Sequence, residues 1–196
     1  MRTIALEEHF WTDELAAAPG TGVLARVNGA VLDGLLRDVG TARIADMDAA
    51  GIDVQVLSHV QPAAQGRSGA AGVEAARRAN DYLAAVVASS AGRLAGFATL
   101  PTGSPSEAAE ELSRCVLSLG FAGGLINSTL GINDRFLDDP SFSALLSRFE
   151  ALDVPLYLHP AQPPAAVRHD LETVAQSRQQ GRSRSDRDDP PAVDQQ

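Results

Sequence analysis

Three side chains in this sequence have the type and spacing to hold a divalent metal ion. Glu7 and His9 lie two residues apart, directly after the short apolar run Thr3 to Leu6. Side chains alternate between the two faces of a β-strand, so a strand here points both groups the same way. A carboxylate oxygen and an imidazole nitrogen aimed together form half of a metal site. The alternative is a solvated Glu beside an incidental His.

His159 is the third candidate ligand. It ends a second apolar run, Val154 to Leu158, and precedes Pro160. A metal-capable residue at the end of a buried strand is typical of a catalytic rim, although a hydrogen-bonded core histidine is the alternative. Together with Glu7 and His9 it forms a carboxylate and two-imidazole set that suits Zn²⁺ or Mn²⁺.

The elements that must position these residues alternate between short β-rich runs and longer helical ones. The stretch 11–37 is expected to be a long loop with a helical piece. We predict strands at 3–6, 53–60, 94–100, 121–127 and 154–159, and helices at 41–50, 72–90, 104–119 and 139–152. Repeated strand–helix–strand units predict a parallel sheet with helices outside, which is an α/β fold.

Such a sheet closes as an open doubly wound layer or as a barrel. The first strand is followed by EEHF and not by a Gly-rich phosphate turn, which favours the (β/α)8 TIM-barrel type. Active sites of these barrels lie at the C-terminal ends of the strands. A complete barrel takes about 250 residues, so 1–160 is predicted to be an incomplete barrel of about five βα units with open, unpaired edges.

The remaining residues, 161–196, have a different composition. From Gln176 the sequence is rich in Arg, Ser, Asp and Gln and has no aromatic residue. Such a segment cannot bury an apolar core, so we expect a low-complexity tail that is disordered or out of frame. The missing strands favour truncation, and a natural flexible tail is the alternative.

Four further residues are weaker site candidates. Asn127 ends the fourth predicted strand, where its amide could hydrogen-bond a substrate carboxylate or hydroxyl; a turn residue is the alternative. Phe10 and Trp11 follow the metal half-site and could wall an aromatic pocket, with core packing as the alternative. His59 ends the second strand, where it lines the pocket or has a structural or solvent-facing role.

Composition restricts the class of partner. The 196 residues carry a formal net charge of −9, which argues against a nucleic-acid surface and favours a small-molecule substrate. No apolar stretch approaches the ~18 residues of a membrane span, and no signal peptide is evident. The single cysteine, Cys115, fits a buried small apolar residue in a reducing compartment. We therefore expect a cytoplasmic protein without membrane or nucleic-acid partners, compatible with a homo-oligomer.

Several segments resemble the amidohydrolase-related (amidohydrolase 2) metal-dependent decarboxylases. The resemblance covers about 3–160 and is closest to the γ-resorcylate and 2,3-dihydroxybenzoate decarboxylases, with aminocarboxymuconate-semialdehyde decarboxylase more distant. It rests on ALEEHF (5–10), MDAAGIDVQVLS (47–58), FLDDPSF (136–142) and LDVPLYLHP (152–160).

The resemblance implies a metal-dependent hydrolase superfamily barrel that decarboxylates a hydroxylated aromatic or related unsaturated carboxylic acid without oxidation. By motif, Glu7, His9 and His159 would ligate the metal and Asn127 would contact substrate. The family's later His, in a G-H-x-G-E-like segment, and its last-strand Asp have no counterpart after His159. The catalytic residues therefore stay unassigned, and little turnover is expected of this chain. The alternatives are a lactone or amide hydrolase of the same superfamily, an inactive fragment, or a subunit that pairs with an intact relative.

Overall fold

Five parallel strands form the sheet that carries the candidate site. The computed structural model describes residues 1–16, 31–128, 130 and 135–161. The sheet order follows the chain, and every neighbouring pair is parallel. This confirms the predicted α/β fold with a parallel sheet. The strands are β1 (Ile4–Phe10), β2 (Val54–His59), β3 (Leu94–Thr99), β4 (Gly123–Asn127) and β5 (Leu156–His159).

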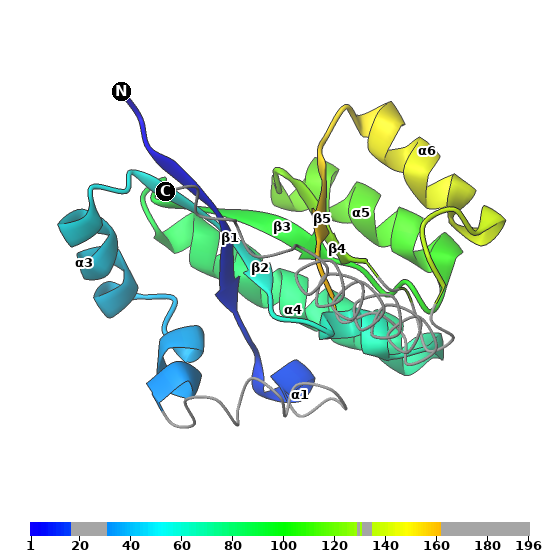
Figure 1. The fold of residues 1–196 in the computed structure, drawn as a ribbon, viewed down its shortest axis with the longest axis horizontal. Coiled ribbons are helices and arrows are strands. Elements are labelled where there is room, and N and C mark those ends of the chain that lie inside the picture. The colour runs from blue at the N-terminus through cyan, green and yellow to red at the C-terminus, as the bar shows by residue number, and fades with distance from the viewer. Residues whose placement is uncertain (17–30, 129, 131–134, 162–196) are drawn as a thin grey trace, which may run out of the picture. The chain divides into compact units, whose positions relative to one another are not determined.

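Helices connect consecutive strands and cover one face of the sheet (Figure 1). The long helices α4 and α5 lie beneath the central strands, and α6 packs beside α5. Residues 31–37 are also helical. The helices are α1 (Asp13–Ala16), α3 (Thr41–Ala50), α4 (Gly69–Ser89), α5 (Pro105–Leu119) and α6 (Ser143–Leu152), and the 3-10 helices are η1 (Ala63–Gly66) and η3 (Pro140–Phe142).

The helix ends follow local sequence signals. Gly51 and Gly120 end α3 and α5 with positive φ values of 68° and 72°. Glycine adopts this left-handed conformation without a Cβ clash, which is why it favours helix ends. Before α6, the carboxylate of Asp139 accepts a hydrogen bond of 2.9 Å from the Ser141 backbone N–H. The predicted ends at Gly51 and Gly120 are confirmed, whereas the helix predicted from Asp139 begins as η3 and continues as α6 only from Ser143.

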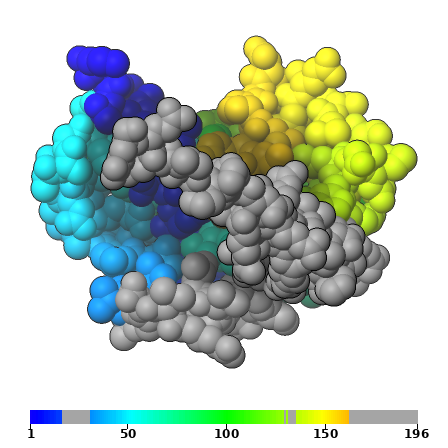
Figure 2. All heavy atoms as spheres, in the orientation of Figure 1, coloured from blue at the N-terminus to red at the C-terminus, as the bar shows by residue number. Residues whose placement is uncertain are grey.

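The sheet is curled and not flat. Strands β1 and β5 occupy its two edges, which in a flat five-stranded sheet would lie about 19 Å apart. Yet the Tyr157 hydroxyl on β5 donates a hydrogen bond of 2.6 Å to Glu7 Oε2 on β1. The strands therefore form a curled half-barrel, as the incomplete-barrel prediction required. In the view of Figure 2, the N-terminal region with β1 (blue) lies on the left and the α6–β5 region (yellow to orange) lies on the right.

Apolar residues pack on both faces of the half-barrel. Between the sheet and the helices lies the main core, formed by residues that include Phe10, Leu57, Ala98, Ile126, Met47, Leu83, Leu112 and Phe149. The inner face carries a smaller cluster of Val56, Phe97 and Leu125, with Ala95 and Tyr157 packed against it. Two residues further along their strands, Ser58, Asn127 and His159 follow this inner cluster, so a polar layer lies at the strand ends.

The described residues form one compact unit, Met1–Ala161. The expectation for 161–196 falls, apart from Ala161, outside the described residues. Within the described part of the chain, no helix is long and apolar enough to span a membrane.

Candidate metal centre

The structure brings together the three residues that the sequence selected as metal ligands. One potential ligand atom from each of Glu7, His9 and His159 lies within 4.8 Å of the others. His159 Nε2 is 3.3 Å from Glu7 Oε1. The two imidazole rings have centroids 5.1 Å apart and an interplanar angle of 72°. This spacing lets a single cation sit between one carboxylate and two imidazoles.

A β-bulge in β1 turns His9 toward the inner face. Ala5 is paired with Gln55 and Glu8 with Leu57, so β1 has one residue more than β2 over this stretch. A one-residue change of register moves every later side chain to the other face. Without the bulge, His9 would pair with His59 on the helix side; with it, His9 pairs with Ser58. The bulge contains Glu7, whose φ is 65°.

Ser58 sets the orientation of the His9 ring. His9 Nδ1 lies 3.1 Å from Ser58 Oγ, and the Ser58 hydroxyl lies 3.5 Å from the Glu8 carbonyl oxygen, to which it donates. The hydroxyl oxygen can therefore accept from His9 Nδ1–H, which leaves Nε2 as the ligand atom. Burial lowers the pKa of His9, and the nearby His159 acts in the same direction. The ring is thus kept neutral, as metal ligation requires.

Tyr157 has the matching role for the carboxylate. Its hydroxyl donates to Glu7 Oε2, and this hydrogen bond lowers the pKa of Glu7 while it raises that of Tyr157. Glu7 Oε1 faces His159. The Nδ1 atom of His159 is buried and has no hydrogen-bond partner among the described residues. An anionic oxygen and two imidazoles whose nitrogens are available fit a divalent metal ion.

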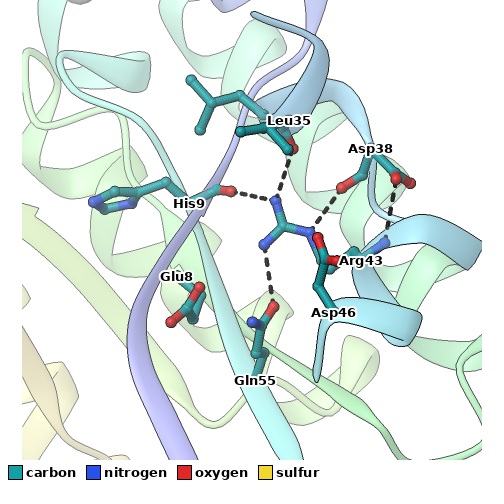
Figure 3. A pocket seen from close by; sticks show the side chains of 8 residues that line it. Glu8, His9, Leu35, Asp38, Arg43, Asp46 and Gln55 are labelled. Atoms are coloured by element: carbon teal, nitrogen blue, oxygen red, sulfur yellow. Dashed lines mark hydrogen bonds between the residues drawn. The ribbon is translucent and has the colours of Figure 1, made fainter. Parts of the chain in front are cut away.

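Arg43 on α3 holds the backbone of the metal strand from the opposite side. Its Nη2 donates hydrogen bonds to the carbonyl oxygens of His9 (2.8 Å) and Leu35 (3.1 Å). Nη1 donates to Gln55 Oε1 at 3.1 Å and Nε to the Asp38 carbonyl oxygen at 2.7 Å. Figure 3 shows the His9 carbonyl pointing to Arg43 while the imidazole points away. The guanidinium therefore ties the end of β1 to β2 and to the segment before α3.

The other predicted site residues lie in different places. Asn127 is 3% exposed and pairs in register with His159, beside the candidate ligands. Phe10 is buried in the core between the sheet and the helices, with its ring 5.2 Å from the His59 ring. Trp11 packs with Leu36 and Val60 in a separate cluster. Both side chains pack against apolar neighbours, and a role for Phe10 or Trp11 in substrate binding stays a prediction.

His59 is also a packed, neutral residue. The Thr12 backbone N–H donates to His59 Nε2 at 3.0 Å, and His59 Nδ1 lies 3.0 Å from the Val60 carbonyl oxygen. Nδ1 must therefore carry the proton and Nε2 the lone pair. Burial lowers the pKa of His59 to about 4. The His59 side chain therefore holds the backbone after β1 through Thr12, and it does not face the metal ligands.

Four residues around the site were not selected from the sequence. Tyr157 could have been predicted, because it precedes His159 by two residues and strand alternation places both side chains on the same face. Ser58 could be placed beside His9 only if the pairing of β1 with β2 were already known. Arg43 and Gln65 come from helices α3 and η1 and reach the strand ends through tertiary contacts, for which the sequence has no pattern.

Comparison with known proteins identifies the family. The family model described as Amidohydrolase matches residues 9–178. The chain therefore belongs to the amidohydrolase family. It is 40% identical over 165 residues to a γ-resorcylate decarboxylase of Polaromonas sp., an alignment that covers 82% of this chain and 50% of that protein.

Solved structures show the same similarity. A dihydroxybenzoic acid decarboxylase from Polaromonas sp., solved with manganese and the inhibitor 2-nitroresorcinol, matches with a TM-score of 0.79 and 37% identity over 90% of this chain and 55% of that one. A 5-carboxyvanillate decarboxylase from Novosphingobium aromaticivorans, solved with manganese and 4-hydroxy-3-methoxy-5-nitrobenzoic acid, matches with a TM-score of 0.77 and 33% identity over 84% and 52%. The chain thus spans about half the length of these relatives.

Proposed function

We propose that this chain carries the metal-binding half of a carboxy-lyase that acts on hydroxylated aromatic acids. The observation that carries the proposal is the convergence of Glu7, His9 and His159 at the C-terminal ends of β1 and β5, where barrels of this type place their active sites. The names of the relatives support decarboxylation in place of lactone or amide hydrolysis, because each of the three proteins described above is a decarboxylase.

Glu7, His9 and His159 would hold the metal through one carboxylate oxygen and two imidazole nitrogens. When bound, a divalent metal supplies a Lewis acid that polarises substrate oxygens. Manganese is the cation we favour, because two related structures contain it; the donor set also accommodates Zn²⁺. Ser58 and Tyr157 would keep His9 and Glu7 in the ligating orientation through the hydrogen bonds described above.

The inner face below the ligands suits an aromatic substrate. Phe97 and Tyr157 stack with ring centroids 5.8 Å apart and an interplanar angle of 29°, and Leu125 packs against them. We place the substrate ring over this apolar layer, with its oxygens toward the metal ligands and Asn127. In this proposal the substrate ring contacts Phe97 and Tyr157, and not Phe10 and Trp11.

The experiment is a decarboxylation assay on the Mn²⁺-loaded chain with 2,6-dihydroxybenzoate, in which CO₂ and resorcinol are both quantified. We expect slow turnover that is lost in His9→Ala. The matched control is Glu8→Gln, which removes a carboxylate next to Glu7 that pairs with Leu57 on the helix side of the sheet. Hydrolysis of a lactone or amide without CO₂ release would favour the hydrolase alternative. Bound metal without any turnover would restrict this chain to metal binding.

A further inference from the structure

We propose that Gln65 is a positioning residue that fixes which end of the Asn127 amide faces the substrate. Gln65 lies in η1, the 3-10 helix after β2, and is 4% exposed. Asn127 is the last residue of β4. The inference rests on the proposed function, since it concerns how the same site selects its ligand.

Gln65 holds Asn127 through the backbone and the side chain together. Gln65 Oε1 accepts hydrogen bonds from the Asn127 backbone N–H and from Asn127 Nδ2, both at 2.8 Å. In return, Gln65 Nε2 lies 3.5 Å from the Asn127 carbonyl oxygen. All of these atoms belong to buried residues, so the contacts are protected from competition with water.

The backbone contact determines the orientation of both amides. A backbone N–H can only donate, so the Gln65 atom that it contacts must be the carbonyl oxygen. That oxygen can only accept, so the Asn127 side-chain atom that contacts it must be the nitrogen Nδ2. Asn127 Oδ1 is therefore the free end of the amide. It is buried and has no hydrogen-bond partner within the described ranges.

The free carbonyl lies on the face that carries the metal ligands. Asn127 pairs in register with His159, and Leu125 pairs with Tyr157 two residues earlier. Paired residues of neighbouring parallel strands share a face, and Leu125 and Tyr157 belong to the inner cluster. Asn127 Oδ1 is therefore an unpaired acceptor on the same face of the sheet as His159, its partner in the register.

An acceptor at this position discriminates between ligand groups. A buried carbonyl oxygen accepts a hydrogen bond from a hydroxyl or N–H donor. A carboxylate oxygen is also an acceptor, so placing it there would leave two buried polar atoms unpaired, which disfavours binding. Among the hydroxylated aromatic acids of the proposed function, an acid whose hydroxyl reaches Asn127 Oδ1 satisfies this acceptor, because its O–H donates to Asn127. A methoxy group at the same position cannot donate, so we expect roughly tenfold weaker binding of such an analogue.

The first test follows the Asn127 side-chain amide by NMR in the isotope-labelled 196-residue chain. Asn127→Asp identifies the signals by their loss. We expect slow solvent exchange of the Nδ2 protons in the wild type and in Gln65→Glu, which keeps an acceptor. Gln65→Met removes the acceptor, and exchange should accelerate at least about tenfold. Fast exchange in the folded wild type, or unchanged exchange in Gln65→Met, would overturn the assignment.

The second test measures calorimetric binding of 2-hydroxybenzoate and 2-methoxybenzoate to the Mn²⁺-loaded chain. The wild type and Gln65→Glu should prefer the hydroxy acid, and Gln65→Met should lose the preference while its metal content stays unchanged. A preference that persists in Gln65→Met contradicts the positioning role. If neither acid binds the metal-loaded wild type, the proposed function fails, whereas slow amide exchange would still support the Gln65–Asn127 arrangement.

Discussion

Replacement of His59 by Gln should make the free energy of unfolding less dependent on pH below neutrality. His59 is 2% exposed, and its Nε2 accepts the Thr12 backbone N–H. Burial disfavours the charged imidazolium and lowers the pKa of His59 to about 4. Protonation would also replace the Nε2 acceptor with a donor. In the unfolded chain the same group titrates near about 6.5.

The direction in which the free energy of unfolding changes with pH follows from which state, native or unfolded, binds the proton. Below about pH 6.5 the unfolded chain takes up a proton that the native His59 refuses until about pH 4, so the native state loses stability as the pH falls through this window. The full shift corresponds to about 3 kcal/mol, of which about 2 kcal/mol should be lost between about pH 7.5 and pH 5. Below about pH 4 both states are protonated and this contribution changes no further.

Urea unfolding of the wild type and His59→Gln across this range measures the difference. Gln retains an acceptor and a donor but does not titrate, so its unfolding free energy should be lower near neutrality and less dependent on pH. The difference between the two proteins should shrink by about 2 kcal/mol toward pH 5. Parallel pH profiles for the two proteins would refute the claim that native His59 is neutral and buried.

Two substitutions and one labelling experiment test separate parts of the structure. Ser58→Ala removes the partner of His9 Nδ1 and should weaken metal binding by about tenfold or more, measured by competition with a chelating dye. Glu111→Ala leaves Asn80 and Arg114 without their buried carboxylate and should lower the unfolding free energy by about 3 kcal/mol, measured by urea denaturation. Cys115 is fully buried, and burial raises the pKa of its thiol, so iodoacetamide should label it only after unfolding, as mass spectrometry would show.

Much of the architecture was predictable because local signals agree with it. Gly51 and Gly120 end their helices where a left-handed residue is required, and the apolar runs between helices became the five strands. The curled closure also followed from the residues after the first strand. These features depend on short stretches of sequence, where backbone preference and burial point to the same structure.

The bulge in β1 was not predictable from the same patterns. Simple alternation correctly predicted that Glu7 and His9 face the same side. It could not show that an extra residue is needed to bring His9 opposite Ser58. A residue in the left-handed region is usually glycine, and here it is Glu7, so the sequence gives no sign of the bulge. Backbone conformations of this kind concentrate at functional sites.

The contacts that orient the site residues were also beyond sequence reasoning. Asn127 was selected for its position at a strand end, but the direction of its amide depends on Gln65, which is 62 residues away in the chain. Phe10 was selected because it follows His9, whereas it pairs with His59 and faces the helices. Which side of the sheet a residue occupies is decided by register, and register is a property of the paired strands.

The metal centre is tested by the Mn²⁺ affinity of the wild type beside Glu7→Gln, His9→Ala and His159→Ala, with Glu8→Gln as the control. We predict near-stoichiometric Mn²⁺ in the wild type and in Glu8→Gln, and a loss of binding of at least about tenfold in each of the other three variants. Equal Mn²⁺ binding by all five proteins, or none by a folded wild type, would contradict the claim that these residues form a metal centre.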